Sequence, residues 1–339
     1  MDVAELAFEL VALDSTTGAE GPVGQYLAER LRRAGFDVTL QEVTPGRWNV
    51  YARAGAPVVV LTTHLDTVPP YVPPRRAGDR LYGRGSCDAK GIAAAMVCAV
   101  ERLRAAGAEG VALLFLVGEE AGSDGARAAA RLEPKGRVLV GGEPTGLRLA
   151  RASRGSFRVV VRTRGRAGHS ATAGASREAS AVERLVDLLA ALRTLPLPSD
   201  PEWGATTYNV GRIGGGRAAN VVAEEAWAEI LFRTVEPARP RLWPALKAWA
   251  DGRATLEPGL EVPPARFDVE PGFAATVVPF ATDLPLLEGW GRRYLVGPGD
   301  IEVAHAPDEH VDVTELRAAV DLYERLAVRL LARERDGSP

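Results

Sequence analysis

The chain has 339 residues, with 41 Lys and Arg against 44 Asp and Glu, so that its formal net charge is −3. This length favours two domains at roughly 100–200 residues per domain, and the charge balance argues against a nucleic-acid partner. No apolar run approaches the roughly 18–20 residues of a membrane span, the start MDVAELAFEL lacks the features of a secretory signal, and two cysteines cannot form a disulfide framework, so we expect a cytoplasmic protein.

The first half of the chain has the pattern of an α/β domain. Apolar residues recur with helical spacing over residues 3–35, with a break near 15–21, which predicts two helices. Strands are predicted at 36–43 and 47–54. Further along, we expect buried strands at 57–64, 111–120 and 137–144 and helices at 91–106 and 123–132. The alternation of strand and helix predicts a mostly parallel sheet with helices on both faces.

The pattern changes after about residue 153, where apolar and polar residues alternate along the predicted strands, as they do in strands with one solvated face. We expect two strand–helix–strand units in the order β-α-β-β-α-β, at residues 155–165, 178–195, 206–216, 223–234, 239–251 and 254–262. This order is typical of a ferredoxin-like α+β layer, in which helices pack on one face of an antiparallel sheet.

The buried pattern returns near residue 265, with a strand at 292–300, a helix at 314–334 and a disordered tail at 335–339. We therefore expect an inserted domain at 153–264, within a first domain formed by residues 1–152 and 265–339.

Candidate chemical residues follow the predicted buried strands, at the edge where open α/β sheets bind ligands. They are His64 and Asp66, Glu119 and Glu120, and Glu143, with Asp88 in a glycine-rich loop and His305 after the last apolar strand. Each has an ordinary alternative, such as a capped turn, solvated loop charge or a core histidine. Together, two imidazoles and three carboxylates suit zinc, cobalt or manganese, and one carboxylate can bridge two ions about 3.5–4 Å apart.

Seven stretches between residues 64 and 310 carry a family resemblance: THLDTVP, YGRGSCDAKGI, LVGEEAGSDGA, GGEPT, GHSA, GGGRAANVV and GPGDIEVAHAPDEHV. On these stretches the chain resembles the dinuclear-zinc family of acetylornithine deacetylases, succinyl-diaminopimelate desuccinylases, aminoacylases and glutamate carboxypeptidases. The resemblance implies two divalent ions, Zn²⁺ or else Co²⁺ or Mn²⁺.

The resemblance also implies a role for each matching residue. His64 and Glu143 would hold one ion, Glu120 and His305 the other, and Asp88 would bridge them. Asp66 would orient His64, and Glu119 would be the catalytic base. Lys90 is interpreted as a structural residue and Cys87 as a neighbour of Asp88 that does not bind metal. Glu309 and His310 are interpreted as supporting loop residues.

In the inserted domain, His169 of GHSA resembles the family residue that reaches the scissile carbonyl, often from the partner subunit. Asn220 and Arg233 match positions that contact the carboxylate side of the substrate. The ordinary alternatives are a surface histidine and an arginine on a strand face. The resemblance further implies a homodimer made through the inserted lid domain, and hinges near 152–154 and 264–268 that let this domain close over the metals.

The C-terminal motif looks most like the acetylornithine and acetyl-lysine deacetylase branch of arginine and lysine biosynthesis. This implies a deacylase that releases ornithine or lysine from an N-acyl amino acid, either free or attached to a small acidic carrier protein. The alternatives are a dipeptidase or aminopeptidase with the same two-metal centre, a succinyl-diaminopimelate desuccinylase, and a catalytically silent binding relative.

Overall fold

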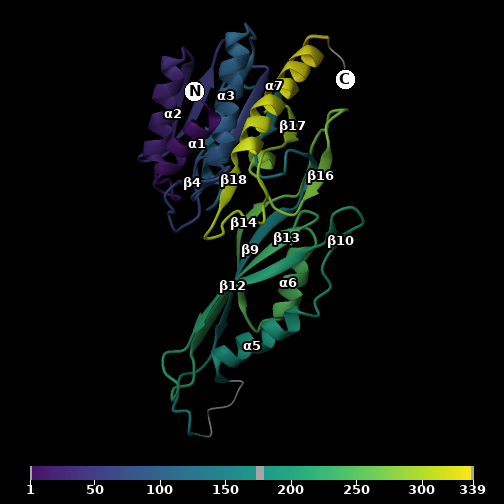
Figure 1. Ribbon diagram of the computed structural model, residues 1–339. Coiled ribbons are helices and arrows are strands. Elements are labelled where there is room, and N and C mark those ends of the chain that lie inside the picture. The colour runs from purple at the N-terminus through teal and green to yellow at the C-terminus, as the bar shows by residue number, and fades with distance from the viewer. Residues whose placement is uncertain (1, 173–178, 337–339) are drawn as a thin grey trace. The chain divides into compact units, whose positions relative to one another are not determined.

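The computed structural model describes residues 2–172 and 179–336, and the chain divides into two compact units (Figure 1). Unit 1 consists of Met1–Arg151, Arg266–Val277 and Thr282–Pro339, and unit 2 of Ala152–Ala265 and Val278–Ala281. The sequence pattern gave no sign of the short return of Val278–Ala281 to unit 2.

Unit 1 contains a six-stranded sheet in the order β1-β2-β6-β3-β7-β17. Its strands are β1 (Asp37–Thr44), β2 (Arg47–Arg53), β3 (Val59–His64), β6 (Val111–Leu116), β7 (Val138–Gly141) and β17 (Arg292–Leu295). β1, β2 and β6 pair antiparallel, whereas β6, β3, β7 and β17 run parallel. The predicted α/β class with a mostly parallel sheet is confirmed.

Helices cover both faces of this sheet, which explains its almost continuous apolar strands. They are α1 (Val3–Ala12), α2 (Gly21–Arg33), α3 (Lys90–Ala105), α4 (Asp124–Ala129), the short η2 (Leu284–Leu286) and α7 (Val313–Asp336). Side chains alternate along a strand, so Leu113 and Phe115 of β6 join a core with α1, α2, α3 and α7. Leu114 points to the opposite face, where α4 contacts β6 and η2.

A small sheet in the order β18-β5-β4 was not predicted. Its strands, β4 (Arg75–Ala77), β5 (Arg80–Tyr82) and β18 (His310–Asp312), are only three residues long. The pairing of His310 with Tyr82 joins the loop that contains Asp88 to the loop that contains His305.

Unit 2 has the predicted β-α-β-β-α-β order. Its elements are β9 (Gly155–Arg164), α5 (Ala181–Leu192), β12 (Thr207–Gly215), β13 (Glu225–Thr234), α6 (Leu242–Ala250) and β14 (Thr255–Val262). The strands form an antiparallel sheet in the order β12-β13-β9-β14. Leu185 of α5 and Leu246 of α6 pack with Phe157 in a single apolar cluster. The ferredoxin-like prediction is confirmed.

Five short strands complete the fold. They are β10 (Ser199–Asp200), β11 (Gly204–Ala205), β8 (Leu149–Ser153), β15 (Ala265–Arg266) and β16 (Ala275–Val278). β10 pairs with β11, and the other three form a sheet in the order β15-β8-β16 where the chain passes between the units.

Several predicted boundaries change; the strand expected at 292–300, for example, ends at Leu295. The helix expected from residue 178 begins at Ala181, after Ser180, whose hydroxyl accepts a hydrogen bond from the Glu183 amide; residue 178 lies outside the described residues. The tail was predicted to be disordered from Arg335, but α7 continues to Asp336 because Leu330 and Leu331 are buried; residues 337–339 lie outside the described part of the chain.

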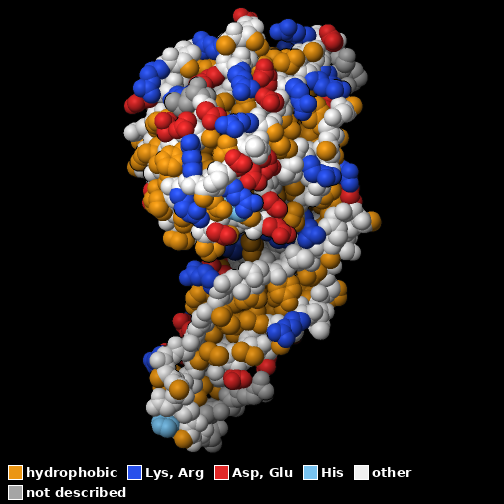
Figure 2. Space-filling model, viewed as in Figure 1, with side chains coloured by type: hydrophobic (Ala, Val, Ile, Leu, Met, Phe, Trp, Pro, Cys, Tyr) orange, Lys and Arg blue, Asp and Glu red, His pale blue; other side chains and the backbone are white. Residues whose placement is uncertain are grey.

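Figure 2 shows acidic and basic side chains interspersed over the visible face of unit 1. Among the described residues, no helix combines the length and the apolar character that crossing a membrane requires.

Asn49 provides a test of the packing around β6. Its buried amide donates to the Gly125 carbonyl at 2.8 Å and its oxygen accepts from the Val117 amide at 3.1 Å. We expect Asn49→Ala to lower the free energy of unfolding by about 2–4 kcal/mol, because two buried backbone groups lose their partner. Urea unfolding measures this. Asn209→Ala, at an exposed position of β12, is the control, and equal effects of the two changes would contradict the prediction.

Candidate metal centre

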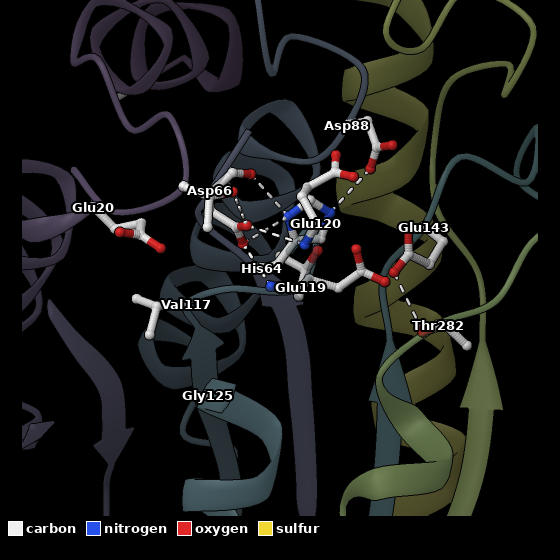
Figure 3. A network of polar contacts seen from close by, with 12 residues as sticks. Glu20, His64, Asp66, Asp88, Val117, Glu119, Glu120, Gly125, Glu143 and Thr282 are labelled. Atoms are coloured by element: carbon white, nitrogen blue, oxygen red, sulfur yellow. Dashed lines mark hydrogen bonds and ion pairs between the residues drawn. The ribbon is translucent and has the colours of Figure 1, made fainter. Parts of the chain in front are cut away.

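The candidate residues of unit 1 gather at the carboxyl edge of the parallel strands, where Figure 3 labels His64, Asp66, Asp88, Glu119, Glu120 and Glu143. His64 is the last residue of β3, Glu119 and Glu120 follow β6, and Glu143 follows β7. Asp88 comes from the loop before α3, and His305 from the loop after β17. The parallel pairing of β3 with β6 and β7 therefore brings together residues that lie far apart in the sequence.

Two overlapping sets of side chains have the spacing of a metal site. Within each set, the potential ligand atoms all lie within 4.8 Å of one another. One set is His64, Asp88 and Glu143; the other is Asp88, Glu120 and His305. A further set of His64, Glu119 and Glu120 meets the same criterion. Asp88 belongs to both of the first two sets, as a bridging ligand would.

The direct contacts agree with this arrangement. Oδ1 of Asp88 lies 3.0 Å from Nε2 of His64, and Oδ2 lies 3.4 Å from Nε2 of His305. The same nitrogen of His305 is 2.8 Å from Oε1 of Glu120. The two oxygens of Asp88 therefore face two different imidazoles.

Electrostatics show that these carboxylates crowd one another. Burial, together with the charge of Asp88, raises the pKa of both Glu143 and Glu120. Hydrogen bonds to Asp88 and Glu120 raise the pKa of His305 to about 10. Burial opposes ionisation of Asp88, but hydrogen bonds from His305 and His64 outweigh it and lower the pKa of Asp88.

The donor set fits divalent cations. Carboxylates crowded in a desolvated site need positive charge close by, and the two imidazoles supply it here only if they are protonated. A mixture of imidazole and carboxylate ligands is the chemistry that zinc, cobalt and manganese accept. His64, Asp88, Glu120, Glu143 and His305 are thus suited to hold a pair of such ions.

The carboxylate of Asp66 makes backbone contacts that the sequence did not indicate. Its Oδ1 accepts a hydrogen bond from the Glu119 amide at 3.0 Å, and its Oδ2 accepts from the Glu120 amide at 3.1 Å. Nδ1 of His64 lies 2.9 Å from the backbone oxygen of Asp66 but 3.5 Å from its carboxylate. The backbone of Asp66 is thus the nearer partner of His64, while its carboxylate holds the Glu119–Glu120 loop.

Two polar residues beside the cluster were missed by sequence reasoning. Thr282 donates to Oε1 of Glu143 at 3.3 Å. Asp283 is buried, which raises its pKa to about 7, and it lines a small cavity with Glu119 and Glu143. Both belong to the segment ATDLPLL, where an acid in an apolar surrounding was the only available signal.

The remaining residues singled out near the centre have local partners. Lys90 is buried and donates to the Leu13 carbonyl at 2.9 Å. The buried thiol of Cys87 lies 3.5 Å from the Asp300 carbonyl. His310 belongs to strand β18, where its ring centroid is 5.0 Å from that of Tyr82.

In unit 2, the structure brings His169 and Asn220 together. His169 is exposed and forms an isolated antiparallel bridge with Val221. The Ser170 amide donates to the Asn220 carbonyl at 3.1 Å. The GHSA and GGGRAANVV stretches therefore lie side by side.

Arg233 lies elsewhere in the same unit. It pairs with Ser156 and Thr207 near the end of β13, a strand of 10 residues that begins just after the Asn220 segment. At about 3.3 Å per residue, Arg233 is roughly 25–30 Å from the start of the strand. In one chain, Arg233 and the His169–Asn220 pair therefore do not form a single small-molecule site.

Comparison with known proteins identifies the family of the chain. The model of the peptidase family M20/M25/M40 matches residues 60–329. A Peptidase M20 domain-containing protein of Schizosaccharomyces pombe is 37% identical, over 94% of this chain and 82% of its own length. A probable carboxypeptidase of Aspergillus flavus is 35% identical, over 96% of this chain and 86% of its own length.

Solved structures share the fold. An M20 family metallo-carboxypeptidase of Sulfolobus solfataricus has a TM-score of 0.78 at 18% identity, covering 96% of this chain and 98% of its own. The aminopeptidase PepT of Bacillus cereus has a TM-score of 0.74 at 21% identity, covering 95% and 96%. A dinuclear metal binding peptidase of Bacillus subtilis has a TM-score of 0.67 at 16% identity, covering 97% and 98%. The chain therefore belongs to the peptidase family M20/M25/M40, and it is a metallohydrolase that acts on peptide or amide bonds.

Proposed function

We propose that this protein is a two-metal carboxypeptidase that releases the C-terminal residue of short peptides. The observation that carries the proposal is the convergence of two imidazoles and two further carboxylates on Asp88, beside the carboxylate of Glu119. In this proposal His64 and Glu143 would hold one Zn²⁺, Glu120 and His305 would hold the other, and Asp88 would be shared by both, with Co²⁺ or Mn²⁺ as substitutes.

The chemistry that a pair of divalent cations would supply at this site is polarisation of the scissile carbonyl and activation of water as a nucleophile near neutral pH. Glu119 takes a proton from the attacking water and passes it to the nitrogen of the leaving amine as the C–N bond breaks. Burial, followed by the charge of Asp283, raises the pKa of Glu119, which suits a group that must accept and then return a proton. Asp66 keeps Glu119 in place through its amide.

The substrate class is inferred from the relatives. Most of their names are peptidase names, and the carboxypeptidases among them match 96% of this chain. The deacylase of ornithine or lysine biosynthesis that the C-terminal motif implied finds no support among them, so the peptidase alternative becomes the main proposal. Hydrolysis of an N-acyl amino acid stays a second candidate, because it requires the same attack on an amide carbonyl.

Unit 2 would contribute to substrate binding from two directions. Arg233 is a cation that can pair with the terminal carboxylate of a peptide. Because the His169–Asn220 pair lies at the far end of β13, a small substrate that contacts Arg233 would meet the partner subunit's His169 in a homodimer. This arrangement also needs the proposed lid role of unit 2.

Metal removal tests the centre itself. We expect elemental analysis to find two zinc ions per chain, and dialysis against a chelator to abolish peptide hydrolysis, because in this mechanism the ions would polarise the carbonyl and activate the attacking water. Adding Zn²⁺ or Co²⁺ should restore activity, whereas Mg²⁺, which prefers oxygen ligands, serves as the control. Full activity in the metal-free protein would contradict the proposal.

Substitution of the two adjacent acids, Glu119 and Glu120, distinguishes the catalytic base from the metal ligand. Glu119→Gln should keep both metal ions and lower kcat by about 10²–10⁴-fold, the range for loss of a general base. Glu120→Gln should lose one ion as well as activity. Glu302→Gln, at an exposed position near His305, is the control. The roles are wrongly assigned if Glu119→Gln is the variant that loses metal.

A substrate panel decides between the chemistries. The carboxypeptidase proposal predicts release of lysine from N-acetyl-Ala-Lys and no hydrolysis of the same peptide with an amidated C-terminus. A deacylase would instead prefer N-acetyl-lysine or N-acetyl-ornithine, and an aminopeptidase would require a free amino terminus and accept the amide. Amino-acid release measured at equal substrate concentrations distinguishes the three.

A further inference from the structure

A buried ion pair lies next to the metal cluster without belonging to it. Nη1 of Arg84 is 2.6 Å from Oε2 of Glu309, and each residue is only 2% exposed. A buried pair repays its desolvation only when further hydrogen bonds use the remaining donors and acceptors. The contacts of this pair therefore indicate what it does.

Glu309 holds the turn that contains Asp88. Its Oε1 accepts hydrogen bonds from the amides of Gly85, Cys87 and Asp88, at 2.9, 3.1 and 3.1 Å. Three backbone N–H groups converging on one carboxylate oxygen set the path of this turn. The position of the Asp88 backbone therefore depends on a side chain more than 200 residues further along the chain.

Arg84 holds the loop that contains His305. It donates to the carbonyls of His305 and Ala306, at 3.3 and 3.2 Å. His305 has a φ of 65°, in the left-handed region that residues other than glycine adopt at a free-energy cost. Such a conformation persists only where surrounding contacts maintain it, and the bond to its carbonyl is one such contact.

The five candidate ligands differ in how they are anchored. His64 ends β3, and Glu143 follows β7, where the Gly142 amide donates to the Thr62 carbonyl at 2.8 Å. Glu120 is fixed through its amide by Asp66. His305 instead comes from a loop between β17 and β18, and its side chain is 47% exposed. The sheet therefore supports one half of the cluster more directly than the half that contains His305.

We propose that Arg84 and Glu309 are a positioning pair that assembles the His305 half of the metal centre. The inference rests on the proposed two-metal function. It predicts that loss of the pair weakens the site of His305 far more than the other. The turn of Asp88, which both sites share, loses one support, but His64 and Glu143 keep their strand anchors while His305 loses its frame.

Cobalt titration of the metal-free protein tests this, since Co²⁺ bound to the protein absorbs visible light. We expect two Co²⁺ per wild-type chain. Glu309→Gln should keep one site within about threefold of wild type and weaken the second by about 10–100-fold, the range for loss of a residue that orients a metal ligand. Asp308→Asn, at the exposed neighbouring position, is the matched control and should bind as wild type does.

A second variant covers the case in which Glu309→Gln does not fold. Arg84→Lys keeps the positive charge beside Glu309, but a lysine cannot donate to both carbonyls as the guanidinium does. This variant should therefore also weaken Co²⁺ binding at the second site more than at the first, by a smaller factor than Glu309→Gln. Thermal unfolding of the metal-free variants monitors the fold independently.

The outcomes are separable. Two sites of wild-type affinity in both variants, or equal weakening of both sites, would overturn the positioning role. A wild-type chain that binds no Co²⁺ would instead overturn the proposed two-metal function.

Discussion

The candidate metal centre of unit 1 depends on one physical constraint, which is that several carboxylates are held close together at one edge of the sheet. Glu120 and Glu143 approach Asp88 closely enough that its charge helps to raise their pKa values. Separate carboxylates would move apart in water, but the hydrogen-bonded pairing of β3, β6 and β7 does not allow this. The apolar core on both faces of the sheet thus stabilises an arrangement that repels itself and that divalent cations would neutralise.

Side chains outside the cluster decide its geometry. Asn49 holds the backbone at Val117, and Asp66 holds the next turn through the amides of Glu119 and Glu120. Arg84 and Glu309 connect the loops that contain Asp88 and His305. Each of these contacts joins a side chain to backbone and so supports a loop that lies outside the sheet. Such support is what keeps a metal site preorganised.

In unit 2, by contrast, the candidate substrate-binding residues lie far apart. His169 and Asn220 adjoin one another just before β13 begins, whereas Arg233 lies near the other end of that strand. A rigid ten-residue strand separates two groups that the family resemblance assigns to one substrate. In the proposed homodimer, one substrate would contact both subunits, so that assembly and substrate recognition would be linked.

The sequence by itself determined the fold class and most of the candidate centre. Apolar strands alternating with helices specified the parallel sheet, and His64, Glu120 and Glu143 could be predicted because parallel strands end at one edge. The strands of the β4–β5–β18 sheet are too short to show a period. The roles of Arg84, Glu309 and Asp283, and the separation of Arg233 from His169, were decided only by tertiary structure. These features consist of contacts between distant residues, 225 positions apart for Arg84 and Glu309, and a local pattern of residue types does not encode which distant groups meet.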